Sequence, residues 1–183
     1  MLLDTLSEFC IRHEIVQKKD LPMLRYCIEK RFYSIINLFP LFFIGIMLAN
    51  FTTTVSFLIS FSYLRSMTNG LHAKKPGICF LYSLLIEFVL FKYIIPLISF
   101  AYVIIFLIAS ILVVFSLAPF NHPCMSLTPD EVEACRVASR HRLLHLLFVL
   151  FSSTVLSWTG ISIGLCLGIA LASVLLCLAY IFN

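Results

Sequence analysis

Long apolar runs separated by short polar segments dominate the chain from residue 33 onward. Six stretches carry almost no charge: 33–49, 51–64, 78–91, 93–117, 143–158 and 161–182. A helix that spans a bilayer needs about 17–25 apolar residues. The first, fourth and sixth stretches reach that length and the fifth nearly does, whereas the second and third have only 14 residues each. We therefore predict six membrane helices, of which the second and third are the least regular.

The first 32 residues follow a different pattern. Leu2, Leu6 and Phe9 recur at roughly helical spacing, and charged residues lie between them. Such an amphipathic pattern is typical of helices that lie in the membrane interface. We therefore expect interfacial helices over residues 1–32, followed by a membrane domain over residues 33–183.

Two polar segments, residues 65–77 and 118–142, are expected to form the main loops of this domain. Within the second, Thr128-Pro129-Asp130-Glu131 combines an N-cap residue, a proline at N1 and an acid at N3. This combination marks a helix start. A helix should therefore begin there and continue into the fifth span.

Composition agrees with this membrane interpretation. Hydrophobic residues make up 61% of the chain and charged residues 12%, with a mean hydropathy of +1.05. Soluble domains are roughly 45–50% apolar and about 25% charged. A soluble enzyme, a disordered chain and a nucleic-acid binder are therefore excluded. The predicted fold class is all-α: a polytopic protein in a lipid bilayer, with about six transmembrane helices and amphipathic N-terminal interfacial helices.

The basic residues fix an orientation. With six spans, the N-terminal segment and both polar loops share one side of the membrane. That side then carries all but one of the 13 Lys and Arg residues, and Lys92 alone lies opposite. The positive-inside rule places the basic side in the cytoplasm. We therefore expect a multi-pass protein with both termini cytoplasmic.

The first polar loop holds residues that could support thiolate chemistry. His72 could take the thiol proton of Cys79, the thiolate could attack a carbonyl, and the imidazolium could protonate the leaving amine. Lys74, Lys75 and the N-terminus of the helix beginning near Ile78 would stabilise the thiolate. An ordinary polar loop before a cysteine in a helix explains the same residues, and chemistry alone favours this second interpretation.

Four residues in and beside this loop occur at a spacing that resembles a known protein family. The pattern R-x4-G-x-H-x6-C is formed by Arg65, Gly70, His72 and Cys79. It resembles the pattern of the accessory gene regulator protein B (AgrB) family of membrane cysteine endopeptidases. The segment over residues 117–123, Leu-Ala-Pro-Phe-Asn-His-Pro, is similar to the Ala-Pro loop of that family. The likeness extends over nearly the whole chain in length, span order and loop placement.

This resemblance implies a function. It implies His72 and Cys79 as the catalytic pair, with Arg65 and Gly70 supporting the site, and no cofactor. The implied substrate is a propeptide of the AgrD type, cut on the C-terminal side of its future ring. A side chain of the propeptide then attacks the acyl-enzyme, and a thiolactone or lactone leaves as a quorum-sensing autoinducer. The resemblance also implies a bacterial cell membrane and suggests a homodimer.

Two positions depart from the family pattern. Asn69 precedes Gly70 where relatives often have a second glycine. Asparagine tolerates left-handed backbone better than other non-glycine residues, so we expect the turn to survive. Cys124-Met125 replaces an Asn-Lys pair that often follows the Ala-Pro loop. This change removes a positive charge that could meet an acidic propeptide tail.

Other polar residues are candidates for substrate contact. Lys74, Lys75, Arg136 and Arg140 could bind the acidic tail of the propeptide, or they could only set the orientation and touch anionic lipid. Glu87 lies eight residues beyond Cys79, two turns along the same helix. An acid within a membrane span is a functional candidate. Glu87 could orient a partner or line the propeptide path, or it could snorkel to the outer boundary.

Two alternatives compete less well. His141 and His145 are four residues apart, a spacing that can bind metal, but no acid lies in the same turn and no metal site is expected.

A non-enzymatic small transporter or scaffold is the alternative function. A transporter would distribute polar residues through several spans. Here the predicted interior carries almost only Glu87, and the reactive groups gather on the cytoplasmic side.

Overall fold

The computed structural model describes residues 36–69, 76–97, 100–121 and 127–182. The chain divides into two units between Leu41 and Phe42, and every contact described below lies among residues of the second unit, Phe42–Asn183. The predicted interfacial helices over residues 1–32 lie outside the described residues.

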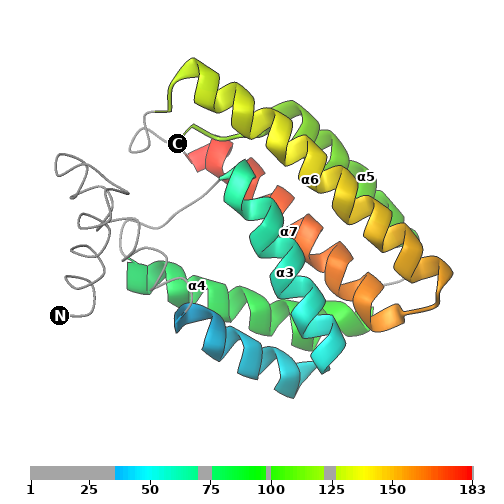
Figure 1. Ribbon diagram of the computed structural model, residues 1–183. Helices are drawn as coiled ribbons and strands as arrows, with labels where there is room; N and C mark the ends of the chain where they lie inside the picture. Colours follow the sequence, from blue (N-terminus) through cyan, green and yellow to red (C-terminus); the bar gives the residue numbers. More distant parts are fainter. Residues whose placement is uncertain (1–35, 70–75, 98–99, 122–126, 183) are drawn as a thin grey trace, which may run out of the picture. The chain divides into compact units, whose positions relative to one another are not determined.

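All regular structure in the described residues is helical, as the predicted all-α class requires. Figure 1 shows the helices, which are Ile36–Leu48, α3 (Phe51–Thr68), α4 (Pro76–Val89), α5 (Phe100–Leu117), α6 (Pro129–Val155) and α7 (Thr159–Phe182). α4 continues through a π-helical turn, η2 (Leu90–Ile94), and a 3-10 turn, η3 (Ile95–Leu97). Each of the six predicted apolar stretches thus contains a helix.

The described helices differ in their capacity to cross a membrane. Phe80–Leu97 and Thr159–Phe182 are long and apolar enough to span it, by length and composition. Ile36–Leu48 and Val103–Leu117 are apolar but shorter. The structure therefore provides two candidate membrane spans among the described residues, where the sequence predicts six.

The boundary between the third and fourth apolar stretches differs from the prediction. The sequence places a break at Lys92, but the helical run continues through this residue to Leu97. Lys92 is tolerated because its side chain is exposed and its ammonium lies 5.1 Å from the centre of the Phe88 ring. Pro96 lies in the last turn instead, and a proline inside a helix removes a backbone hydrogen bond.

The start of α6 agrees with the prediction. The Glu131 backbone N–H donates to the Thr128 hydroxyl (3.3 Å), and the Thr128 backbone N–H donates to Glu131 Oε2 (2.8 Å). These bonds form the capping box, with Pro129 as the first helical residue. The Thr128 backbone and side-chain hydrogen bonds lower the pKa of the Glu131 carboxyl. α6 then runs unbroken to Val155.

α3 and α7 pack against each other through small residues. Gly164 and Gly168 lie one turn apart on α7 and face α3. A Cβ at Gly168 would lie 2.8 Å from the Phe61 backbone nitrogen and 2.9 Å from the Phe57 carbonyl oxygen. Helices in lipid associate through such close packing, because lipid supplies no hydrophobic force between them. The two backbones therefore approach closely only because α7 has glycines at these two positions.

The largest group of buried side chains surrounds this helix pair. It joins Leu64 of α3, Val114 of α5, Leu143 of α6 and Ile169 of α7, all fully buried. A second cluster joins Phe57 of α3, Phe91 of η2 and Leu167 of α7. α5, α6 and the end of α4 are thus all held against the α3–α7 pair.

We predict that Gly168→Ala destabilises the protein by about 1–3 kcal/mol, the usual cost of overpacking a tight core. The added methyl would clash with backbone atoms of α3, which cannot rotate away as the end of a flexible side chain can. Gly160→Ala is the matched control on the same helix, because its methyl would meet mainly the exposed Thr52 hydroxyl. Thermal unfolding in detergent should show a lower midpoint for Gly168→Ala only. Equal midpoints for the two variants would contradict the proposed packing constraint.

Candidate functional site

The motif Arg65, Gly70, His72 and Cys79 runs from the end of α3 to the start of α4. Arg65 lies in the last turn of α3, and Cys79 is the fourth residue of α4, in its first turn. Gly70, His72, Lys74 and Lys75 lie outside the described residues, and so does the side chain of Cys79. The structure therefore describes the two helix ends that hold the motif, and the distance between His72 and Cys79 stays untested.

The end of α3 has the backbone turn expected from the sequence. Asn69 has a φ of 56°, and its backbone N–H donates to the Arg65 carbonyl (3.1 Å). The Arg65 guanidinium donates in turn to the Asn69 carbonyl. Positive φ is uncommon outside glycine, and asparagine is one of the few residues that adopt it readily. Asn69 thus has the positive φ that the sequence predicts, and the course of the turn at Gly70 stays a prediction because Gly70 lies outside the described residues.

The end of α3 is hydrogen-bonded to the segment that follows α5. The Phe120 backbone N–H donates to the Thr68 carbonyl (3.0 Å), and Asn69 Nδ2 donates to the Phe120 carbonyl (3.3 Å). Thr68 is fully buried at this junction. The two segments whose sequences resemble the AgrB pattern, about fifty residues apart in the chain, therefore meet in space.

α7 holds the other side of the same segment. The Tyr180 hydroxyl donates to the Leu117 carbonyl (2.8 Å), and its ring packs edge-on against Phe120 with centres 5.0 Å apart. Ala118 and Phe120 are buried, and the Ala118–Pro119 peptide bond is cis. The Ala-Pro segment is thus fixed between α3 and α7, beside the point where the motif begins.

Sequence reasoning did not identify Thr68, Phe120 or Tyr180 as parts of this junction. Thr68 and Phe120 contribute backbone groups, which any residue would supply. Tyr180 resembles the many other aromatic residues of the apolar spans. The only available signal was that both family-like segments carry the resemblance, which suggests that they act together.

The arginines near this end have partners within the protein. Arg140 Nη2 donates to the Phe115 carbonyl in the last turn of α5 (2.9 Å), where a cation is favourable. Arg136 forms an exposed ion pair with Glu133 at 2.6 Å, the type of pair that contributes about 0–1 kcal/mol. The predicted contact of Arg136 and Arg140 with a propeptide stays a prediction, and Arg140 also has a structural role.

Glu87 is buried rather than snorkelling. Its side chain is 1% exposed, and within the described part of the chain neither carboxyl oxygen has a hydrogen-bond partner. A Cβ at Gly45 would lie 3.0 Å from Glu87 Oε1 and 2.9 Å from the Thr54 hydroxyl. Glu87 therefore faces Gly45 and the first turn of α3. Cys79 is about 12 Å away along the α4 axis, eight residues at 1.5 Å each.

The two histidines of α6 do not form a metal centre with other described residues. His145 Nδ1 lies 3.3 Å from the Tyr63 hydroxyl of α3, and His141 is exposed. No group of three or more His, Cys, Asp or Glu side chains that could share an ion occurs within the described ranges. A zinc site needs at least three protein ligands.

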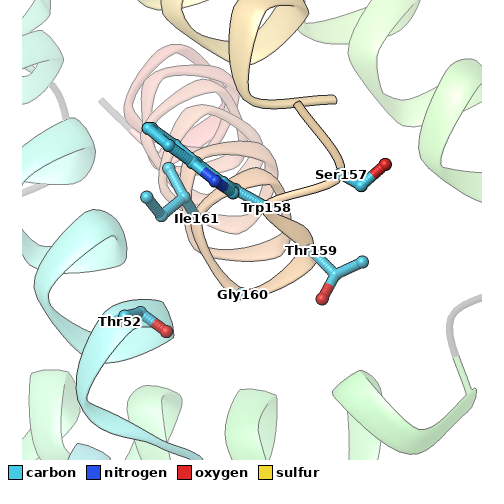
Figure 2. Close-up of a pocket in the computed structure, with 6 residues that line it drawn as sticks. All are labelled: Thr52, Ser157, Trp158, Thr159, Gly160 and Ile161. Atoms are coloured by element: carbon cyan, nitrogen blue, oxygen red, sulfur yellow. The ribbon is translucent and has the colours of Figure 1, made fainter. Parts of the chain in front are cut away.

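A shallow hollow of about 400 Å³ lies at the other end of α3. Figure 2 shows its lining around the start of α7, with Trp158 and Ile161 from that region and Thr52 from α3. The remaining lining residues are Ser157, Thr159 and Gly160. None of these side chains titrates near neutral pH. The hollow therefore lacks the groups that acid–base or thiolate catalysis requires.

We predict that the turn at Asn69 is sensitive to substitution in a graded way. Asn69→Gly keeps the positive φ and loses only the bond to Phe120, whereas Asn69→Ala loses the bond and also forces alanine into a conformation that costs about 1–3 kcal/mol. Thermal unfolding in detergent should rank the wild type first, Asn69→Gly second and Asn69→Ala last. An alanine variant as stable as the glycine variant would show that the positive φ is not required.

Comparison with known proteins agrees with the motif and its surroundings. The family model described as accessory gene regulator B matches residues 4–181. Among curated proteins and among solved structures, nothing matches the chain. Members of this family are membrane-associated and process quorum-sensing peptides together with an AgrD-type propeptide. Because the match covers nearly the whole sequence, the chain belongs to the accessory gene regulator B (AgrB) family.

Proposed function

We propose that this protein is a cysteine endopeptidase of the bacterial cell membrane that cleaves the C-terminal part of an AgrD-type propeptide. Cys79 is the nucleophile and His72 the general base. The observation that carries the proposal is the junction of Thr68 and Asn69 with Phe120. This junction joins the start of the R-x4-G-x-H-x6-C motif to the Ala-Pro segment.

The position of Cys79 supports its role as the nucleophile. It lies in the first turn of α4, which begins at Pro76. The backbone N–H groups of a first helical turn and the helix dipole stabilise a negative charge. A cysteine at a helix N-terminus is therefore more readily ionised, and the thiolate is the reactive form.

The reaction follows from these two groups. His72 takes the thiol proton of Cys79, and the thiolate attacks the scissile carbonyl of the propeptide. The C–N bond breaks when the imidazolium gives its proton to the leaving amine, and a thioester to Cys79 remains. A thiol or hydroxyl of the bound propeptide then attacks this thioester. The macrocyclic thiolactone or lactone leaves, and its nucleophile's proton returns the enzyme to the thiol form.

The distribution of charge supports a cytoplasmic site. Three arginines lie near the end of α3 where the motif begins: Arg65 in its last turn, Arg142, which donates to Tyr63 of α3, and Arg140, which donates to the last turn of α5. Lys92 lies in η2, beyond the opposite end of α4. By the positive-inside rule we expect the motif end in the cytoplasm, and with six spans both chain termini would lie on the same side. The six-span topology belongs to this proposal. So does a homodimer, which rests on the family resemblance alone.

In this proposal Lys74 and Lys75 are the main basic residues that bind the propeptide. Arg140 is bound to the end of α5, and Arg136 is paired with Glu133. The lysines follow the proposed catalytic histidine by two and three residues, and their charge is opposite to that of an acidic propeptide tail. Arg136 could exchange its exposed partner for the tail at little cost.

The alternative of a transporter or scaffold has less support. Buried hydroxyl side chains do occur, but Ser139, Ser153 and Ser173 each donate to a carbonyl one turn earlier in their own helix. These three hydroxyl groups are therefore satisfied within their own helices. Glu87 is the one buried charged side chain among the described residues.

We predict that Cys79→Ala abolishes propeptide cleavage and that His72→Gln slows it by about 10²–10⁴-fold, the usual contribution of a general base. The assay uses purified enzyme in proteoliposomes with a synthetic propeptide, and mass spectrometry quantifies the C-terminal fragment released over time. Cys135→Ala, on α6, is the matched control and should cleave at the normal rate. Normal cleavage by Cys79→Ala would refute the mechanism.

A further inference from the structure

We propose that the α3–α6 face of the protein contains a binding site for the phosphate of an anionic phospholipid. The site consists of Tyr63 and Ser66 of α3 with Arg142 and His145 of α6, called here the Tyr63 cluster. It lies on the exposed side of α3 and α6. Its four side chains take no part in the proposed peptidase chemistry.

Arg142 is held in a fixed orientation. Its Nη1 donates to the Tyr63 carbonyl (2.8 Å) and to the Ser66 hydroxyl. Its guanidinium also lies over the Tyr63 ring, 4.6 Å from the ring centre. A guanidinium has five N–H donors, and these contacts use only one nitrogen. Within the described ranges no carboxylate pairs with Arg142, so the cluster presents an oriented cation that lacks an anionic partner.

The neighbouring groups complete a site for phosphate oxygens. The Tyr63 hydroxyl and His145 Nδ1 are 3.3 Å apart and both residues are exposed. In this pair one group donates to the other, so the pair has one donor left for an anion: the imidazole Nε2–H when the hydroxyl donates to Nδ1, or the hydroxyl when Nδ1–H donates to it. The free N–H groups of the Arg142 guanidinium can donate to the same anion. Arginine is particularly suited to phosphate because its planar donors match the phosphate oxygens in pairs. The Tyr63 cluster therefore binds a phosphate through several oriented groups, whereas an isolated surface charge would provide only one.

The location of the cluster identifies the phosphate as part of a lipid. This inference rests on the proposed six-span topology. In that topology the apolar stretch of α3 ends at Leu64 and that of α6 begins at Leu143, so the cluster lies where both helices would leave the hydrocarbon region. One turn further into the apolar region, Ile59 of α3 is 60% exposed and Phe148 of α6 is 71% exposed. A ligand with a phosphate and an acyl chain can contact both parts, whereas an acidic peptide or free phosphate uses only the polar part.

The test measures lipid binding directly, independently of peptidase activity. Purified protein in detergent is titrated with phosphatidylglycerol or phosphatidylcholine, and native mass spectrometry quantifies the bound lipid. Phosphatidylglycerol should bind more tightly than phosphatidylcholine, and Arg142→Gln should weaken its binding about tenfold, as expected for loss of a charge-assisted hydrogen bond. Arg136→Gln removes the same charge from the same helix and should bind phosphatidylglycerol like the wild type.

Further variants and competitors separate the possible outcomes. Tyr63→Phe and His145→Gln should each weaken phosphatidylglycerol binding several-fold, and their melting temperatures report whether the fold is intact. Inorganic phosphate should not displace the lipid. The proposal is overturned if Arg142→Gln loses no more affinity than Arg136→Gln. Displacement of phosphatidylglycerol by a soluble acidic peptide would also overturn it, and would assign the Tyr63 cluster to the propeptide tail.

Discussion

The close approach of α3 and α7 at Gly164 and Gly168 is the contact around which α5, α6 and the end of α4 pack. In lipid no hydrophobic force draws helices together, so contact depends on packing and on hydrogen bonds between them. Ser60 lies at this contact: its hydroxyl donates to the Phe57 carbonyl of α3 at 3.1 Å, and the Gly164 carbonyl of α7 is 3.5 Å from the same oxygen. α5, α6 and the end of α4 then pack against the surfaces that the pair presents. A side chain at either glycine would separate the two backbones.

This helix pair brings three chain segments together at one end. The end of α3, the Ala-Pro segment after α5 and the last turns of α7 are joined there through Thr68, Phe120 and Tyr180. The bonds also supply partners for backbone groups at helix ends, which lack partners within their own helices. The segment that contains His72 starts from this junction and leads to Cys79 on α4. We infer that the junction fixes one end of the segment that holds the proposed catalytic pair.

Features encoded by neighbouring residues were predictable from the sequence. The apolar runs located the helices, Thr128 and Glu131 marked the start of α6, and Asn69 was expected to adopt the positive φ that it has. Features that depend on contacts between distant residues were not predictable. The burial of Glu87 depends on Gly45 of another helix, and the Thr68–Phe120 bond joins backbone groups that carry no sequence signal. The spacing of His72 and Cys79 gained meaning only from the family pattern, since many loops contain such a pair.

The central claim, that Cys79 forms an acyl-enzyme with the propeptide, can be tested by trapping that intermediate. A propeptide whose ring-forming Cys or Ser is replaced by Ala can acylate the enzyme but cannot cyclise, so the thioester should accumulate. After rapid quenching at acidic pH and digestion, mass spectrometry should find the N-terminal part of the propeptide attached to the peptide that contains Cys79. Hydroxylamine should release it, as expected for a thioester. Attachment at another residue, or cleavage with no adduct on Cys79, would contradict the account.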